Sequence, residues 1–225
     1  MIEAKSLCKS YGGFKAVDDL SFTVEAGQVL GFLGPNGAGK STTMKMLTGF
    51  LTPTSGTALV NGIDVVEQSV AARKNIGYLP EGAPSYGEMT VIQFLTFIAH
   101  ARAIAKSEVP ESVENAIRKL NLTGVKHQPI ETLSKGFKRR VGLAQAIIHD
   151  PQILILDEPT DGLDPNQKRE VRGLIRAMAE DKIIIISTHI LEEVEAVCNR
   201  VMIIAEGRLL ADDSPQGLIK RSRYH

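Results

Sequence analysis

The part of this chain that most constrains its fold is a glycine-rich stretch at residues 34–41, which matches the P-loop pattern G-x-x-x-x-G-K-[ST]. A short apolar run precedes the stretch and a helical pattern from Lys40 to about Leu51 follows it, so the order is strand, loop and helix. Glycines let the backbone fold into a nest whose N–H groups point at one anion, and the start of the helix adds its positive end. The stretch therefore predicts a phosphate-binding loop in the first unit of an α/β fold.

Two side chains of this loop have individual roles in the prediction. Lys40 is expected to bridge the β- and γ-phosphates of a nucleotide, and the Ser41 hydroxyl is expected to ligate Mg²⁺. The residues assigned to nucleotide binding here are Gly34, Pro35, Asn36, Gly37, Ala38, Gly39, Lys40, Ser41 and Thr42.

A pair of carboxylates, Asp157 and Glu158, ends the apolar run at residues 153–156. A carboxylate at the carboxyl end of a buried strand is badly placed for packing but well placed for a metal beside a P-loop. We assign Asp157 to Mg²⁺, through water, and Glu158 to the polarisation of the attacking water.

Apolar runs and helical periods alternate along the chain. Four-residue runs such as 153–156 and 183–186 are typical of central parallel strands that are buried on both faces. Between about residues 90 and 148 only helical periodicity occurs. We therefore expect an α/β P-loop core with a mixed sheet, built from residues 1–81 and 150–225, and an inserted helical subdomain at 82–149.

Composition limits the classes of function. The 225 residues carry 26 basic (Lys+Arg) and 26 acidic (Asp+Glu) side chains, so no strongly basic field for nucleic acid is expected. Cys8 and Cys198 lack metal-ligand spacing and are expected to be two buried, reduced thiols, as suits a cytosolic protein. The apolar runs are far shorter than the ~20 residues of a membrane span.

One basic group is expected to be a solvated face rather than a nucleic-acid patch: Lys135, Lys138, Arg139 and Arg140.

Further motifs accompany the P-loop in a fixed order. Leu133-Ser134-Lys135-Gly136-Phe137 precedes a helix. Gly162-Leu163-Asp164 follows the strand that ends in Asp157, and Ser187-Thr188-His189 follows the next strand. In order and spacing the whole chain resembles the nucleotide-binding domain of ABC transporters. The resemblance implies an ATPase that uses Mg²⁺ with ATP and pairs head-to-tail with a second copy of itself or a paralogous ATPase. It also implies a separate transmembrane permease, bound at the cytoplasmic face of the cell membrane.

The same resemblance implies roles for residues outside the P-loop. Each ATP would be covered by the Ser134-Lys135-Gly136 segment of the other chain, because a helix start can offer a hydroxyl and N–H groups to a phosphate. Asp164 would cross the dimer interface, and His189 would contact the γ-phosphate and help to hold the attacking water. Tyr11 would stack on adenine through its flat ring.

At two places the sequence departs from the usual motifs of the family, and these departures narrow the subgroup that it resembles. Lys135 and Phe137 stand where the family usually has glycine and glutamine, and Glu81 stands where glutamine is usual. Glu81 is still expected to reach Mg²⁺ or the water. Both departures resemble a subgroup whose ATPase and permease are separate polypeptides, generally assigned to export, with reported roles for drugs, antibiotics, lipids or polysaccharides, gliding motility and enzyme maturation. The proline- and glycine-rich connector at residues 79–87 is expected to report ATP occupancy to a permease docked near residues 84–89.

Two other classes stay open beside the transport ATPase. A soluble ABC ATPase of translation resembles two fused domains, and one of DNA repair carries a long coiled coil between P-loop and signature. This sequence holds one such domain and has no room for a coiled coil between Lys40 and Ser134. A non-catalytic, nucleotide-gated module would lack Glu158 or His189, and both are present.

Overall fold

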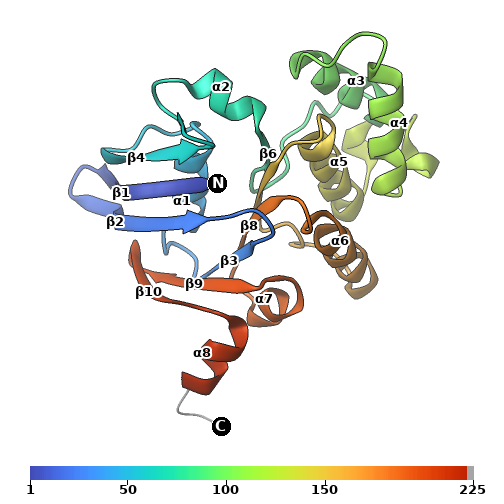
Figure 1. Cartoon of the computed structure of the whole chain (residues 1–225). Coiled ribbons are helices and arrows are strands. Elements are labelled where there is room, and N and C mark those ends of the chain that lie inside the picture. The colour runs from blue at the N-terminus through green and yellow to red at the C-terminus, as the bar shows by residue number, and fades with distance from the viewer. Residues whose placement is uncertain (222–225) are drawn as a thin grey trace.

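The computed structural model describes residues 1–221 and contains two sheets with helices around them. The smaller sheet is antiparallel and has the order β2-β1-β4-β5. Its strands are β1 (Ile2–Tyr11), β2 (Phe14–Val24), β4 (Ser55–Val60) and β5 (Ile63–Asp64). Figure 1 shows this sheet on one side of the molecule and the helices α3, α4 and α5 on the other.

The larger sheet is mixed and has the order β10-β9-β3-β8-β7-β6. Five of its strands are parallel, and β10 runs antiparallel to β9 at one edge. The strands are β3 (Val29–Leu33), β6 (Ile76–Leu79), β7 (Ile153–Asp157), β8 (Ile183–Thr188), β9 (Arg200–Ala205) and β10 (Arg208–Asp213). The expected α/β fold with a mixed sheet is confirmed.

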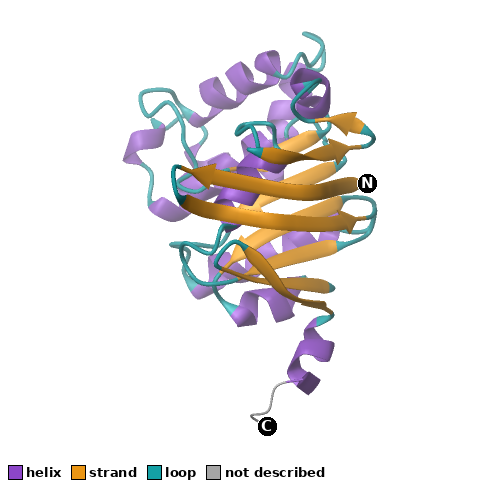
Figure 2. Ribbon diagram, turned by 90° about the vertical axis from the view of Figure 1, so that its left-hand side faces the viewer, coloured by secondary structure: helices purple, strands orange, loops and turns teal. Residues whose placement is uncertain are grey.

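The helices connect these strands. They are α1 (Lys40–Leu47), α2 (Ser69–Lys74), α3 (Val91–Ala101), α4 (Val109–Lys119), α5 (Lys135–Ile147), α6 (Pro165–Met178), α7 (Leu191–Val197) and α8 (Pro215–Arg221). Between β6 and β7 the chain forms three α-helices and two short 3-10 turns, and Thr90 begins the first helix with a capping box to Gln93. Figure 2 shows the strands of both sheets in successive layers with helices behind them.

The central strands divide the interior into two cores. In β7, Leu154 and Leu156 pack with the helices α3–α5, whereas Ile153 and Ile155 pack between the two sheets. Successive strand residues point to opposite faces, so a strand with both faces covered is apolar throughout. The whole of β7 is buried, as the apolar run predicts.

Three expectations about local structure were wrong. The helix after the P-loop ends at Leu47 rather than near residue 51, because Gly49 adopts a left-handed conformation (φ 64°) and turns the chain. Cys8 is only partly buried, although Cys198 is buried as expected. Two of the four basic residues assigned to a solvated face, Arg139 and Arg140, are buried at 6% and 8% exposure.

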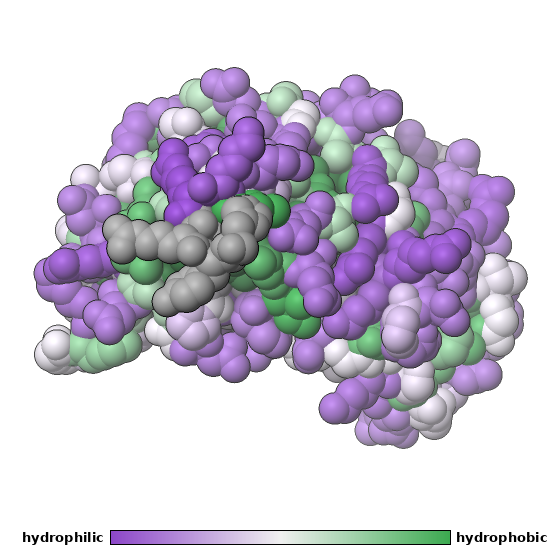
Figure 3. All heavy atoms as spheres, turned by 90° about the horizontal axis from the view of Figure 1, so that it is seen from below, coloured by the Kyte–Doolittle hydropathy of each residue, from purple (hydrophilic) through white to green (hydrophobic). Residues whose placement is uncertain are grey.

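Within residues 1–221, no helix combines the length and the apolar character that crossing a membrane requires. The face of the molecule seen in Figure 3 is mainly hydrophilic, and hydrophobic side chains reach its surface only in small groups.

Candidate functional site

The glycine-rich loop connects β3 to α1, as the pattern predicts. Gly39 is the N-cap of α1 at φ 101°, and a Cβ at this position would lie 2.4 Å from the carbonyl oxygen of Ala16. Only glycine fits such a conformation and such a close approach. The loop is therefore held against the first residues of β2.

Lys40 begins α1 with its side chain folded back over the loop. Its Nζ donates hydrogen bonds to the carbonyl oxygens of Gly34 (2.6 Å) and Pro35 (3.0 Å), and the residue is 6% exposed. No carboxylate pairs with this ammonium group among the described residues. A buried cation without an acidic partner, held beside a helix N-terminus, is a strong attractor for a phosphate.

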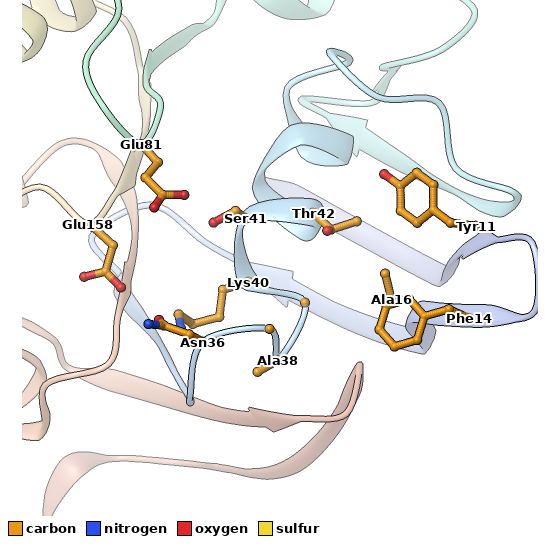
Figure 4. A pocket seen from close by; sticks show the side chains of 12 residues that line it. Tyr11, Phe14, Ala16, Asn36, Ala38, Lys40, Ser41, Thr42, Glu81 and Glu158 are labelled. Atoms are coloured by element: carbon orange, nitrogen blue, oxygen red, sulfur yellow. The ribbon is translucent and has the colours of Figure 1, made fainter.

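A pocket of about 490 Å³ opens over this loop. It is lined by Tyr11, Phe14, Ala16, Asn36, Gly37, Ala38, Gly39, Lys40, Ser41, Thr42, Glu81 and Glu158. Figure 4 shows Glu81 and Glu158 on one side of the start of α1, and the two aromatic rings on the other. The pocket thus has an acidic end, a phosphate-binding floor and an aromatic end.

Asp157 closes β7 and is fully buried. Its Oδ1 accepts a hydrogen bond from the Ser187 hydroxyl on the adjacent strand β8, and its Oδ2 has no hydrogen-bond partner. A buried carboxylate oxygen without a partner is costly in a folded protein. This buried carboxylate oxygen therefore fits a hydrated cation as its partner.

Glu158 follows in a left-handed backbone conformation (φ 50°), and its carboxylate reaches His189. The Oε1 atom lies 3.0 Å from His189 Nδ1, and the Glu158 N–H donates to the Ser187 carbonyl (3.2 Å) and hydroxyl (3.1 Å). Burial raises the pKa of Glu158, and the hydrogen bond from His189 opposes that rise. The two residues that sequence reasoning placed at the reaction are therefore in direct contact.

The signature segment lies outside this pocket. Ser134 is the N-cap of α5 and accepts from the Phe137 N–H, while Gly136 is buried so closely that a Cβ would meet the Gln167 side chain at 2.3 Å. Asp164 is the N-cap of α6 and accepts from the N–H groups of Asn166 and Gln167, at 3.0 Å each. None of Ser134, Lys135, Gly136 or Asp164 lines the pocket over the P-loop of the same chain.

Sequence reasoning missed two kinds of residue at this site. Phe14 and Ala16 line the pocket, and Phe14 pairs across the β1–β2 hairpin with Tyr11. The Gly12-Gly13 turn between the two aromatic residues was the available signal. Arg139 was interpreted as solvated, yet its guanidinium donates to the carbonyls of Pro80, Asp157 and Glu158, directly behind the site.

A strand, P-loop and helix, with two carboxylates at the end of a nearby parallel strand, define a P-loop nucleotide-binding ATPase. A profile of the family described as "ABC transporter" matches residues 17–161, and the chain belongs to this family. The part of the chain that the profile matches is an ABC-type ATP-binding domain.

Individual relatives agree with this assignment. The chain is 40% identical over 99% of its length to the probable multidrug ABC transporter ATP-binding protein YbhF of Escherichia coli (strain K12), and spans 38% of that protein. It is 40% identical over 97% of its length to the Nod factor export ATP-binding protein I of Rhizobium meliloti, and spans 65% of it. The structure of cbiO1 from Clostridium perfringens, part of the ABC transporter complex cbiONQ, superposes with a TM-score of 0.86 at 29% identity, covering 98% of this chain and 90% of that one.

Proposed function

We propose that the chain hydrolyses ATP to energise a separate exporter-type permease, from the cytoplasmic face of the cell membrane. The observation that carries the proposal is the acidic end of the pocket, where Glu158 faces the P-loop and contacts His189. The names of the two curated relatives, which describe multidrug transport and Nod factor export, support the direction of transport.

In this proposal the phosphates lie on residues 34–42, with Lys40 turning from its loop carbonyls to the β- and γ-phosphates. Mg²⁺ would be held by Ser41, by Glu81 and, through water, by Asp157, whose Oδ2 lacks a partner. Mg²⁺ usually takes its remaining ligands from phosphates and water. When bound, Mg²⁺ supplies neutralisation of phosphate charge.

Hydrolysis is assigned to Glu158 and His189. Glu158 polarises the attacking water, and the raised pKa of its carboxyl brings its basicity closer to that of an effective general base near neutral pH. His189 is exposed on its free side, so it can contact Glu158 and a γ-phosphate at the same time. Tyr11, with Phe14 beside it, provides the aromatic surface for adenine.

The working unit in this proposal is a head-to-tail dimer. Ser134, Lys135 and Gly136 do not line the pocket of their own chain. Ser134 and Lys135 are exposed at the N-terminus of α5, where they can cover a partner's γ-phosphate. We assign Asp164 to the same interface. The helical region at 82–149 then acts as a subdomain that carries the signature segment over the partner's ATP, and residues 1–81 and 150–225 form the core.

The permease is assigned to a groove of about 620 Å³ between this core and α3. Phe50, Tyr86 and Phe97 are 74%, 56% and 43% exposed and line it, together with Pro84 of the connector. Exposed aromatic side chains gathered in one groove mark a protein-binding surface, and the connector that lines it also carries Glu81 from the nucleotide pocket. The proposed coupling between ATP and permease runs through residues 79–87.

The test of this function is the Glu158→Gln variant, which keeps the size of the side chain and removes its charge. ATP turnover is expected to fall by at least about 100-fold because the water loses its base, while ATP binding is retained and ATP-dependent dimers persist. Turnover can be measured by phosphate release and dimers by size-exclusion chromatography with ATP. Near-normal turnover would move the catalytic role elsewhere, with Glu81 the first candidate.

A further inference from the structure

Arg139 is a buried arginine on the second turn of the signature helix α5. Its guanidinium donates hydrogen bonds to three backbone carbonyls, those of Pro80 (3.3 Å), Asp157 and Glu158. These carbonyls belong to two segments far apart in the sequence, the connector before Glu81 and the carboxyl end of β7. One side chain therefore joins the signature helix to both segments that carry the acidic end of the pocket.

Arg139 contacts the backbone at Glu158, where the conformation is unfavourable and must be held by hydrogen bonds. Glu158 has a left-handed φ of 50°, a conformation that residues with a Cβ rarely adopt and that surrounding bonds must maintain. Its N–H is held by Ser187, and its carbonyl accepts from Arg139 and from the Asp161 N–H. The peptide groups on both sides of the Glu158 Cα are thus fixed, which sets the direction of its side chain toward His189.

Arginine is suited to this task in a way that other side chains are not. Its planar fork offers several N–H groups in a fixed geometry and stays charged, whereas a lysine ammonium acts as a point donor. Among the residues that the structure describes, Arg139 forms hydrogen bonds but no ion pair. Burial lowers the pKa of its guanidinium, and the nearby carboxylates of Asp161, Asp157, Glu158 and Glu81 oppose that shift. Its partners are carbonyls, and its position is therefore specified by backbone geometry.

We propose that Arg139 is a positioning residue for ATP hydrolysis: it fixes the backbone of Glu158 for attack and ties the signature helix to the hydrolytic carboxylate. The inference rests on the proposed function of Glu158. It implies that a movement of α5 is transmitted to Glu158 through Arg139, because the guanidinium contacts the carbonyls of both segments.

The experiment measures steady-state ATP hydrolysis by the full chain with Arg139→Ala. The matched control is Arg140→Ala, which removes an equally buried guanidinium of the same helix whose partner is Glu170 (2.9 Å) on α6. For Arg139→Ala we expect kcat to fall by about 10- to 100-fold, because small displacements of a reacting group have effects of this size. The KM for ATP should stay within about threefold, because the P-loop and Tyr11 are untouched. Millimolar guanidinium should restore kcat to Arg139→Ala by filling the vacated site, and should not raise that of Arg140→Ala.

Several results would overturn the inference. Wild-type kcat in Arg139→Ala, or equal losses of kcat in both variants without rescue by guanidinium, would mean that the side chain serves stability alone. If Arg139→Ala does not fold, Arg139→Lys is measured in its place, because a lysine cannot reach all three carbonyls. A wild-type kcat in Arg139→Lys would again refute the proposal. Glu158→Gln is measured in parallel: if it keeps its turnover, the proposed function fails, whereas loss of turnover there beside normal Arg139 variants refutes only the role of Arg139.

Discussion

At the residue scale, the two neighbouring carboxylates at the end of β7 differ in burial and in their hydrogen-bond partners. Asp157 is fully buried and accepts from Ser187, while Glu158 is partly buried and contacts His189. The left-handed turn at Glu158 directs its side chain away from the sheet and into the pocket. This difference fits the roles proposed above, Asp157 beside a cation and Glu158 beside the attacking water.

The aromatic end of the pocket gives a prediction about base recognition. Tyr11 and Phe14 are 52% and 63% exposed and are cross-strand partners in one hairpin, so both can contact a base. Tyr11→Ala should weaken ATP binding by about 1–2 kcal/mol, in line with stacking of a base on an aromatic ring. Phe14→Ala should show a smaller loss of the same kind. Isothermal titration with ATP, GTP and CTP would measure the effect, which should follow ring size.

The control for this prediction is Tyr11→Phe, which keeps the ring and removes the hydroxyl. No hydrogen bond from the Tyr11 hydroxyl is present in the described structure, so the affinity for ATP should change little. A large loss in Tyr11→Phe would show that the hydroxyl, and not the ring, recognises the nucleotide.

The sequence was informative for residues whose role is local and less so for residues that act across the fold. The P-loop could be predicted because its glycines, Lys40 and Ser41 are adjacent and serve one loop. Arg139 could not be interpreted correctly, because a run of basic residues on a helix does not show which of them faces three distant carbonyls. The position of Phe14 in the pocket could be predicted only from the hairpin turn that brings it opposite Tyr11.

At the scale of elements, the close packing of β6 against α5 sets the position of the signature helix. A Cβ on Gly77 of β6 would lie 2.1 Å from the Ala146 carbonyl oxygen and 2.8 Å from the ring of Pro151. Farther along, a Cβ on Gly142 of α5 would lie 2.8 Å from the Cβ of Ala83 in the connector. Small residues on both elements therefore keep the helix close to the strand that leads to Glu81.

Gly77→Ala is expected to destabilise the fold by about 3 kcal/mol, because the clash is with backbone that cannot rotate away. The matched control is Gly173→Ala in α6, where a Cβ would meet nothing within 4 Å. That control should stabilise the helix by up to about 1 kcal/mol. Urea denaturation of both variants measures the two effects. Equal stabilities for Gly77→Ala and the wild type would contradict the close packing of β6 against α5.

The elements themselves were predictable to different degrees. The buried strands β7 and β8 were predictable, because strands covered on both faces are uniformly apolar. The edge strand β10 was not, because Arg208–Asp213 is largely exposed and its apolar run, residues 209–211, is short. The end of α1 was misplaced by several residues because apolar periodicity continues past Gly49, where the backbone turns.

At the scale of the whole molecule, the signature segment lies outside the nucleotide pocket of its own chain, and one chain does not complete the proposed site. The pocket over the P-loop is closed by Glu81 and Glu158 at one end and by aromatic rings at the other. Ser134 and Gly136 do not line it, and Ser134 is exposed at the start of α5. Two chains related by a two-fold axis would supply each pocket with the segment it lacks.

This arrangement predicts complementation between two inactive variants. Lys40→Ala should lose ATP binding on its own P-loop, and Ser134→Arg should place a bulky side chain over the partner's phosphates, so each variant alone should hydrolyse ATP poorly. In a mixed head-to-tail dimer, one composite site carries both substitutions and the other carries neither. Mixing the two variants in equal amounts should therefore leave about a quarter of all sites intact, and phosphate release should rise well above that of either variant. If Ser134 instead acts on the ATP of its own chain, every site in the mixed dimer carries one defect, and mixing will restore nothing. A mixture of Lys40→Ala with Glu158→Gln serves as the control, because both residues belong to the same pocket and no intact site can form.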